Sequence, residues 1–414
     1  MLAILLALHF EVRSIADEVS GASEWQEDLS YLSEALEARH IDLYHTISAQ
    51  DFEAEIERLR DVGEALSPQQ RRVALMHLLR RVGDGHTGAP LWSDSIHRFP
   101  FEVSLIDGAA IVTGTTDSYR DLLGAELVRL NQFSVAEIKS KLEQIVPFVE
   151  NQHSLRVRTG LYFLVEDLLV GLGYVQADAP IELTFRQGQD LLMVEASAID
   201  QVTYEKEVVH RLLPRKPELY FERHPSVASS LWFGEREDGK TIYIQFDRYP
   251  SFEDMQRFGE ALLTHMRHRG SEHVIIDLRR NFGGDFFVGL TLASYLNLAD
   301  SVDWEDGVYV LIGNRTFSAA MSNAAQFRQI LNARLVGAPT GARPCGFQDM
   351  GQFELPNSSL IVTYSKRRFC FVDTAHDSVL PDHSIELEES DYLGSSDRVL
   401  DWVLEDISRD QSDD

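Results

Sequence analysis

The sequence is poor in cysteine and in basic residues, and it contains no long apolar run. Two of its 414 residues, Cys345 and Cys370, are cysteines, so at most one disulfide can form. A framework of bridges is therefore excluded, and neither cysteine stands in a metal-ligand spacing. Acidic residues outnumber basic ones by 66 to 38, which gives a formal net charge of -28. Such a charge disfavours nonspecific binding to nucleic acid or to an anionic membrane.

The two ends of the chain have distinctive compositions. Leu2 to Leu8 is an apolar run too short to cross a bilayer as a helix. No Lys or Arg precedes it and Glu11 follows soon after, so residues 1–24 either form a signal or leader segment or begin a buried helix. The first alternative implies a secreted or cell-envelope protein, and the second a cytoplasmic one. At the other end, residues 406–414 predict a frayed acidic tail.

Apolar periodicity divides the rest of the chain into three regions. Residues 25–97 show helical spacing, and Ser67-Pro68 is a typical helix start with a capping serine and a proline at the first helical position. Residues 98–225 contain short apolar runs between turn residues, which predict a β-rich domain with a helical insertion. Residues 226–405 alternate strand and helix patterns.

This last region predicts an α/β core. Strands separated by helices of ordinary length form βαβ units, so we expect a largely parallel sheet. The strands are expected at 241–246, 273–278, 308–312 and 334–336, and the helices at 252–269, 286–298 and 317–331.

Two turns that follow strands of this core could carry chemistry. Gly283 and Gly284 let the backbone adopt positive φ and expose N–H groups that can bind an oxyanion, although most such turns only connect elements. Ser318 stands at the start of the next helix, where free N–H groups stabilise negative charge and the small Ala319 and Ala320 leave its hydroxyl accessible. A serine in this setting is alternatively a simple N-cap.

A nucleophilic serine needs a base, and His86 is the best placed of the 14 histidines. It lies in the turn Asp84-Gly85-His86-Thr87, which follows a helix, and catalytic side chains are often carried by such turns. The alternative is a turn histidine that is hydrogen-bonded to the backbone. His265 and His268 share a helix face, but Gly270 is a helix stop and the neighbouring arginines repel a cation, so we expect no metal site there.

Several motifs together resemble those of the C-terminal processing (tail-specific) peptidases, the tricorn core proteases and the interphotoreceptor retinoid-binding proteins. Asp277-Leu278-Arg279-Arg280-Asn281-Phe282-Gly283-Gly284 is similar to the family's glycine turn, and Thr316-Phe317-Ser318-Ala319-Ala320 to its nucleophile segment. Leu335-Val336-Gly337 and Leu380-Pro381-Asp382 follow in the expected order. The histidine turn resembles that of the tricorn-like branch, and His40-Ile41-Asp42-Leu43-Tyr44 resembles a stretch of the helical module of bacterial members.

The resemblance implies a crotonase-like (ClpP/crotonase type) βαβ core and a PDZ-like β-rich domain, the latter on residues 124–131. It also implies that Ser318 is the nucleophile and His86 the general base, with the amides of Gly283 or Gly284 and of Ala319 as the oxyanion hole. No metal or organic cofactor is implied.

The sequence departs from the family's pattern at two places. The processing peptidases have a catalytic lysine after the Leu-Val-Gly strand, whereas residues 338–343 contain none, and Arg343 cannot replace it because it stays protonated. The tricorn-like branch has a serine before the histidine, where this chain has Gly85. The orienting group is therefore open, with Asp373 and Asp377 as candidates by position only.

These observations favour a serine peptidase that forms an acyl-enzyme at Ser318. Its substrates would be peptides or proteins, bound through C-terminal tails if the PDZ-like region captures chain ends, and the chain could form homo-oligomers. One alternative is a ligand- or peptide-binding protein of the same fold that has lost turnover. Another is a hydrolase that acts on a small acyl substrate.

Overall fold

The computed structural model describes residues 24–92, 96–214, 217–224, 229–372, 375–394 and 396–410. Residues 1–23 of the predicted leader segment and residues 411–414 of the predicted acidic tail lie outside these ranges, whereas residues 406–410 belong to the last helix. Within them, no helix is both long and apolar enough to cross a membrane.

The N-terminal part is helical, as the periodicity predicts. It comprises a helix over residues 24–39, α2 (Ala49–Val62) and α3 (Pro68–Arg80). Ser67 caps α3 and forms a capping box with Gln70, and Pro68 occupies the first turn, which confirms the predicted helix start. The helix ends at the loop that carries His86.

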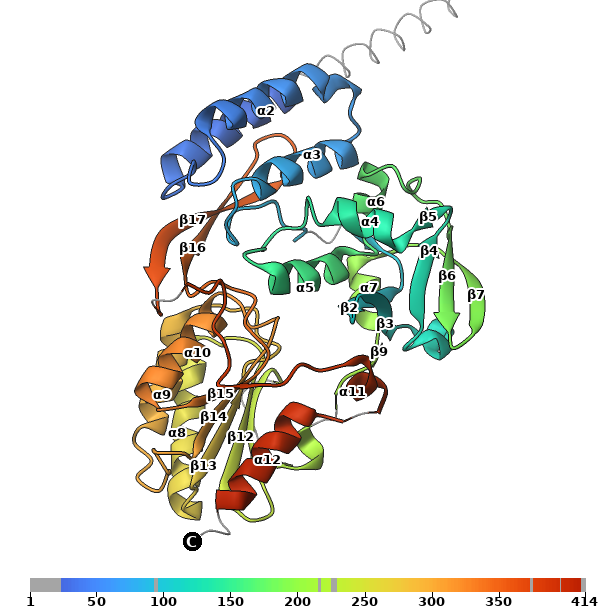
Figure 1. Ribbon diagram of the computed structural model, residues 1–414. Coiled ribbons are helices and arrows are strands. Elements are labelled where there is room, and N and C mark those ends of the chain that lie inside the picture. Colours follow the sequence, from blue (N-terminus) through green and yellow to red (C-terminus); the bar gives the residue numbers. More distant parts are fainter. Residues whose placement is uncertain are drawn as a thin grey trace, which may run out of the picture.

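The next region is built on an antiparallel sheet with the strand order β2-β3-β4-β6-β7 (Figure 1). These strands are β2 (Phe101–Ile106), β3 (Ala109–Thr115), β4 (Glu126–Leu130), β6 (Ile181–Gln187) and β7 (Asp190–Ala196). The short strands are β1 (His97–Arg98), β5 (Phe133–Ser134), β8 (Ile199–Asp200) and β9 (His210–Arg211).

Four helices accompany this sheet, namely α4 (Val135–Leu142), α5 (Gln152–Tyr162), α6 (Glu166–Gly171) and α7 (Gln201–Glu207). The helix predicted over 135–146 ends four residues early. The following Pro147 disfavours helical geometry in the residue before it, and residues 143–146 form hydrogen-bonded turns instead. The sheet, α4 to α6 and the N-terminal helices share one buried apolar cluster.

The C-terminal part contains a second sheet, with the order β10-β11-β12-β13-β14-β15-β18. It is parallel from β12 to β18 and antiparallel at β10 and β11, which confirms the predicted parallel core. The strands are β10 (Glu222–Arg223), β11 (Leu231–Glu235), β12 (Thr241–Phe246), β13 (His273–Asp277), β14 (Val308–Ile312), β15 (Arg334–Gly337) and β18 (His383–Ser384).

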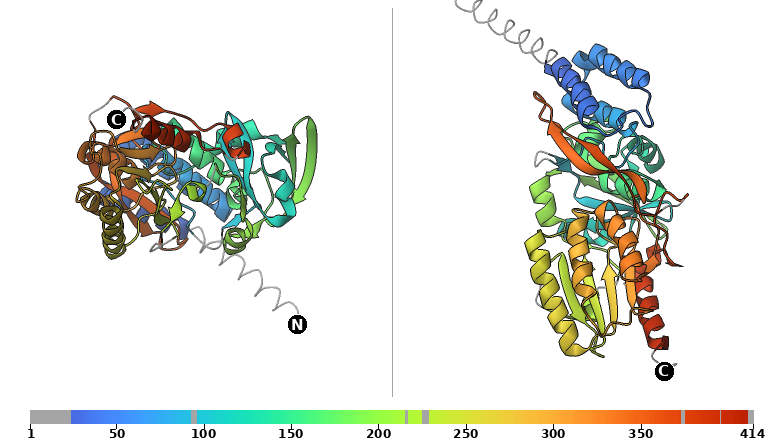
Figure 2. Two further views of the ribbon diagram at one scale, coloured as in Figure 1. Left: turned by 90° about the horizontal axis from the view of Figure 1, so that it is seen from below. Right: turned by 90° about the vertical axis from the view of Figure 1, so that its left-hand side faces the viewer.

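Helices cover both faces of this sheet (Figures 1 and 2). α8 (Phe252–Arg269), α9 (Phe286–Leu296) and α10 (Ala319–Ile330) pack on one face, and α12 (Arg398–Asp410) packs on the other. Successive residues of β12 supply both cores, because Ile242 and Ile244 contact the first layer while Tyr243 contacts the second. The short α11 (Glu389–Gly394) precedes α12.

A long hairpin that the sequence analysis did not predict joins the two parts. Its strands are β16 (Cys345–Glu354) and β17 (Ile361–Cys370), and a disulfide links Cys345 to Cys370 across its base. The hairpin extends from the C-terminal core to the N-terminal helices (Figure 2). At its far end the amide of Asn357 donates to Asp28, at 2.8 Å. It thus connects the histidine loop and the core that carries Ser318.

Candidate active site

Ser318 lies between β14 and α10 in a backbone conformation that a side chain seldom adopts. Its φ is 52° and its ψ is -126°, although it is not a glycine. Such geometry costs on the order of 1–3 kcal/mol and persists where the surrounding structure enforces it, often at functional sites. The hydroxyl makes no capping hydrogen bond to α10. The simple N-cap interpretation of Ser318 is therefore wrong.

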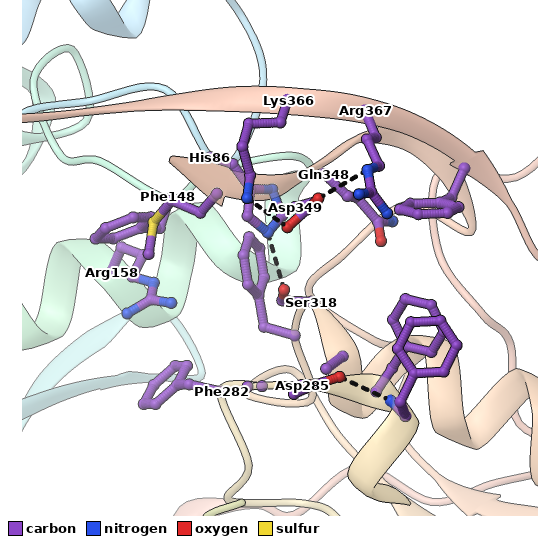
Figure 3. A pocket seen from close by; sticks show the side chains of 18 of the residues that line it. His86, Phe148, Arg158, Phe282, Asp285, Ser318, Gln348, Asp349, Lys366 and Arg367 are labelled. Carbon is purple, nitrogen blue, oxygen red and sulfur yellow. Dashed lines mark hydrogen bonds and ion pairs between the residues drawn. The ribbon is translucent and has the colours of Figure 1, made fainter. Parts of the chain in front are cut away.

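The hydroxyl of Ser318 instead meets the imidazole of His86. The distance between Ser318 Oγ and His86 Nε2 is 2.9 Å, within the range expected of a nucleophile and its base (Figure 3). The two residues are 232 positions apart in the chain. The ring of His86 also stacks on Phe317, with 5.6 Å between the centroids.

Asp84 fixes the loop that carries His86. Its Oδ1 accepts hydrogen bonds from the amides of His86 and Thr87, both at 2.9 Å, and from the hydroxyl of Ser365 at 2.6 Å. Its Oδ2 lies 3.0 Å from His40 Nε2. Burial alone would raise the pKa of Asp84, but the hydrogen bonds from His40, from Ser365 and from the amide of His86 lower it to about 2.

The segment around His40 has a structural role in this loop. His40 Nδ1 accepts the amide proton of Asp42 at 2.9 Å, so Nε2 carries the proton that points at Asp84. The amide of Ile41 donates to the carbonyl of Ser365 in β17 at 3.0 Å. The N-terminal helices, the histidine loop and the hairpin are thereby joined in one buried polar network.

The other nitrogen of His86 faces two acceptors. Nδ1 lies 3.1 Å from the backbone carbonyl of Phe347 in β16 and 3.4 Å from Glu150 Oε1. A carbonyl can only accept, so Nδ1 carries the proton and Nε2 is free to accept the proton of Ser318. This tautomer is the one that general-base catalysis by Nε2 requires.

The carboxylate beside His86 belongs to Glu150, which the sequence analysis did not single out. Its side chain is 4% exposed, and Oε2 accepts the amide proton of Arg343 at 2.6 Å. Oε1 has no hydrogen-bond partner within the described residues, so its contact with His86 is electrostatic. A Cβ at Gly85 would lie 2.4 Å from this oxygen, so Glu150 occupies the space that a serine would need.

Of the two carboxylates expected from position, Asp377 is the one that the structure describes, and it does not take this place. Asp377 is exposed, its backbone carbonyl accepts from Asn151 Nδ2 at 2.8 Å, and its carboxylate accepts from the adjacent Ser378. Asp373 lies outside the described residues. The available signal for Glu150 was an acidic residue directly after an apolar stretch, Val146 to Val149.

The glycine turn and the helix start offer two free amides at the reaction centre. The amide of Gly283 donates to Asn281 Oδ1 at 2.8 Å and is thus occupied. Among the described residues, the amides of Gly284 and Ala319 make no hydrogen bond, and both residues line the pocket around Ser318. Of the three donors expected, Gly284 and Ala319 are therefore the better suited to hold an oxyanion.

The remaining motif residues hold the two turns together. Asn281 is fully buried, donates to the carbonyl of Phe246 at 2.7 Å, and accepts the amide proton of Phe317 on its own carbonyl. A Cβ on Gly283, whose φ is 104°, would lie 2.7 Å from Cβ of Ser318, so only glycine allows this approach.

Behind the turn, Arg279 forms a buried fork to two carboxylates. It contacts Asp277 at 2.6 Å and Asp397, at the start of α12, at 2.7 Å. Burial would raise the pKa of Asp277, but the charge and hydrogen bonds of Arg279 lower it. The charges of Asp277 and Arg279 thus anchor the turn and do not face Ser318.

A pocket of about 730 Å³ opens in front of Ser318. Aromatic rings and charged side chains line it together with His86, Gly283, Gly284, Ala319 and Gln348: Trp92, Phe148, Arg158, Phe282, Asp285, Phe286, Phe287, Phe317, Asp349, Met350, Lys366, Arg367 and Phe369. Within the described part of the chain, no group of three or more potential metal ligands occurs. His265 pairs with Glu235 at 3.0 Å.

The sequence matches no family model. It matches no curated protein either. Among solved structures, it is similar to mature CPAF complexed with lactacystin and to mature CPAF alone, each with a TM-score of 0.60 and 12% identity. The match covers 91% of this chain and 96% and 95%, respectively, of those chains.

The fold is similar to that of CPAF. At this identity the likeness concerns the fold and not the site. The photosystem II D1 C-terminal processing protease is also matched over 88% of this chain and 93% of its own, with 14% identity, but a TM-score of 0.40 is too low to support an argument. The roles of Ser318 and His86 therefore rest on the geometry of the site and not on these comparisons.

Proposed function

We propose that this chain is a serine peptidase in which Ser318 is the nucleophile and His86 the general base. The observation that carries the proposal is the 2.9 Å contact between Ser318 Oγ and His86 Nε2, made in the tautomer that leaves Nε2 able to accept a proton. The strained backbone of Ser318 and the two free amides beside it are the other parts that acyl transfer needs.

The reaction follows from these positions. Ser318 Oγ attacks the carbonyl carbon of the scissile bond while its proton passes to His86 Nε2. The carbonyl oxygen becomes an oxyanion, which accepts hydrogen bonds from the amides of Gly284 and Ala319. The imidazolium then protonates the leaving amine, and an acyl-enzyme remains on Ser318. A water molecule activated by His86 releases the acyl group.

Glu150 is the orienting carboxylate in this proposal. Its charge lies 3.4 Å from His86 Nδ1 in a buried setting and stabilises the imidazolium that forms after proton transfer. The carbonyl of Phe347 holds the ring in the correct tautomer at the same time. No lysine is needed in this arrangement, in keeping with its absence from residues 338–343.

The finer architecture is part of the proposal. Residues 25–97 form the helical module with the histidine loop, residues 98–225 a PDZ-like domain, and residues 226–405 a crotonase-like catalytic core. The antiparallel sheet of the second region is the part suited to bind an extended peptide or a C-terminal tail, since strand edges capture peptides by backbone pairing. Homo-oligomers of the chain are also part of the proposal, and light scattering tests them.

The test is covalent labelling followed by digestion. A fluorophosphonate probe should label the wild-type protein and the matched surface variant Ser294→Ala, and should fail on Ser318→Ala. His86→Ala should lose about 10⁴-fold or more in kcat while keeping a cooperative unfolding transition, whereas His268→Ala should not. A peptide-library digest then identifies cleavage.

The same experiment separates the alternatives. Absence of labelling in folded wild-type protein would favour a binding protein without turnover. Labelling without cleavage of any peptide would favour a hydrolase of small acyl substrates.

A further inference from the structure

An arginine lies in the pocket with its charge unmatched. Arg158 belongs to α5, and its guanidinium sits among three aromatic rings. The guanidinium carbon is 4.1 Å from the ring centroid of Phe282, 5.2 Å from that of Phe148 and 5.3 Å from that of Phe317. Figure 3 shows Arg158 between Phe148 and Phe282, and all three side chains lie on one side of Ser318.

No acceptor meets this guanidinium within the described residues. Neither an ion pair nor a hydrogen bond involves its side chain there, although a guanidinium has five N–H donors. Arg158 is half-buried and lines the pocket, so its N–H groups are open to water or to a ligand and not to an acceptor of the protein. Burial lowers the pKa of Arg158 to about 10, so the group is still protonated at neutral pH.

The position of Arg158 links it to the reaction centre. Two of the three rings belong to residues that directly precede parts of the site: Phe317 precedes Ser318, and Phe282 precedes Gly283. The third, Phe148, has a positive φ of 61°, a strained geometry of the kind found at ligand clamps. Any substrate group that contacts the guanidinium must therefore belong to a residue close to the scissile bond.

The other charged side chains that line the pocket each have a partner on the protein. Asp349 pairs with Lys366 and with Arg367, each at 3.1 Å (Figure 3). Asp285 accepts the amide proton of Phe287 at 2.9 Å at the start of α9. Among the described residues that line this pocket, Arg158 is thus the cation without an acceptor on the protein.

We propose that Arg158 binds a carboxylate of the substrate next to the scissile bond, so that the peptidase prefers an acidic residue or a chain-terminal carboxylate there. This inference rests on the proposed function, since it concerns the same pocket. A guanidinium matches a carboxylate with two parallel N–H···O bonds, and the aromatic rings fix its plane and exclude water. The chain has a net charge of -28 and therefore repels acidic substrates, and the positive charge of Arg158 offsets this repulsion inside the pocket.

The test compares matched peptides that differ in one carboxylate. Peptides carrying Glu or Gln on either side of the cleaved bond are prepared with an amidated C-terminus, and a third set carries Gln with a free C-terminal acid. Wild-type protein should cleave one acidic form roughly ten- to a hundredfold faster in kcat/KM than its neutral partner, as for a charge-assisted pair. The set that shows the preference tells a side-chain carboxylate from a chain end.

Arg158→Gln should abolish the preference, and Arg158→Lys should retain part of it, because lysine keeps the charge but not the fork. Arg156→Gln, two residues away on the same helix, should leave it unchanged. Equal cleavage of acidic and neutral peptides by the wild-type protein would overturn the inference, as would an unchanged preference in folded Arg158→Gln.

Failure of the proposed function is distinguishable from failure of this inference. If the fluorophosphonate probe labels wild-type protein but no carboxylate preference appears, the proposed peptidase function is supported and the proposed role of Arg158 is refuted. If the probe does not label wild-type protein, fluorescence anisotropy of labelled peptides on Ser318→Ala still tests binding. Tighter binding of the acidic form, lost in the double variant with Arg158→Gln, supports the carboxylate site, and equal binding refutes it.

Discussion

Replacing Glu150 tests the least expected part of the site. Its two oxygens have different tasks: Oε2 accepts the amide proton of Arg343 at 2.6 Å, and Oε1 faces His86 Nδ1 at 3.4 Å. A glutamine has one oxygen and one NH₂ group. The backbone amide of Arg343 can only donate, so it needs the side-chain oxygen as its acceptor. Glu150→Gln must therefore direct its NH₂ group at His86.

This NH₂ group disfavours the tautomer of His86 that catalysis requires, in which Nδ1 carries the proton. An NH₂ group near Nδ1 favours an unprotonated Nδ1 and hence a proton on Nε2, which then cannot accept the proton of Ser318. Glu150→Ala removes the charge but leaves the carbonyl of Phe347 to hold the proton on Nδ1. We therefore expect the nearly isosteric variant to be the more damaging of the two.

The magnitudes follow from the geometry. Two unit charges 3.4 Å apart at an effective dielectric constant of about 20 interact by about 5 kcal/mol, an upper bound for what Glu150 gives the imidazolium. Because some of this is replaced by solvent and by Phe347, Glu150→Ala should lower kcat by roughly 10²- to 10³-fold. Glu150→Gln should approach the 10⁴-fold loss known for a serine triad with the wrong tautomer.

The assay is steady-state cleavage of the best peptide, with urea unfolding to verify the fold of each variant. Asp377→Asn is the matched control and should change kcat by no more than a few fold. A smaller loss for Glu150→Gln than for Glu150→Ala would refute the tautomer argument. A larger loss for Asp377→Asn than for either would show that the orienting carboxylate has been misassigned.

Three further predictions concern the support of the site. Asp84→Asn should destabilise the fold by roughly 2–3 kcal/mol at pH 7; the contribution is complete above pH 4 and fades as the pH falls toward 2, because the folded pKa is about 2 against 3.8 when unperturbed. Gly85→Ser should lower kcat about tenfold or more, since its Cβ would displace Glu150, now 2.4 Å away. Arg279→Lys should destabilise the protein by about 3 kcal/mol, because lysine cannot bridge both carboxylates.

Each of these three variants has a matched control substitution. Urea unfolding of Asp42→Asn at pH 7 and pH 3 should show no comparable loss. A stability difference between wild type and Asp84→Asn that stays the same from pH 7 down to pH 2 would contradict the pKa argument. Gly394→Ala adds a Cβ that meets nothing within 4 Å and should keep its activity. Arg280→Lys, whose side chain is half exposed, should unfold like the wild type; equal stability of Arg279→Lys would refute the anchoring role.

Local patterns were enough to predict the elements of the C-terminal core. The helix over 252–269 and the strand over 308–312 have the predicted bounds, because apolar periodicity and cap residues such as Gly270 act within a few residues. The cap of α3 by Ser67 was readable for the same reason. The hairpin of β16 and β17 was missed, since its faces are mixed and its partner contacts come from distant helices.

Some residues of the candidate site could likewise be predicted from local sequence, and others could not. Ser318, His86 and the glycine turn could be named from the sequence because each sits at a recognisable strand–turn–helix junction or glycine turn, where local geometry restricts the residue type. Glu150 could not, because an acidic residue becomes an orienting group only when folding brings it to a particular nitrogen. Which glycine amide is free was likewise decided by Asn281, whose side chain occupies the amide of Gly283.

The sequence by itself determined the parallel core, the helical N-terminus and the residue types able to do acyl transfer, since these depend on periodicity and on short-range sterics. The tertiary structure alone decided that His86 meets Ser318 across 232 positions, that Glu150 faces the imidazole, and that Arg158 points its charge into the pocket. The physical reason is that electrostatic and hydrogen-bonding partnerships depend on distances of a few ångströms. Those distances are set by the packing of whole elements and leave no trace in local sequence.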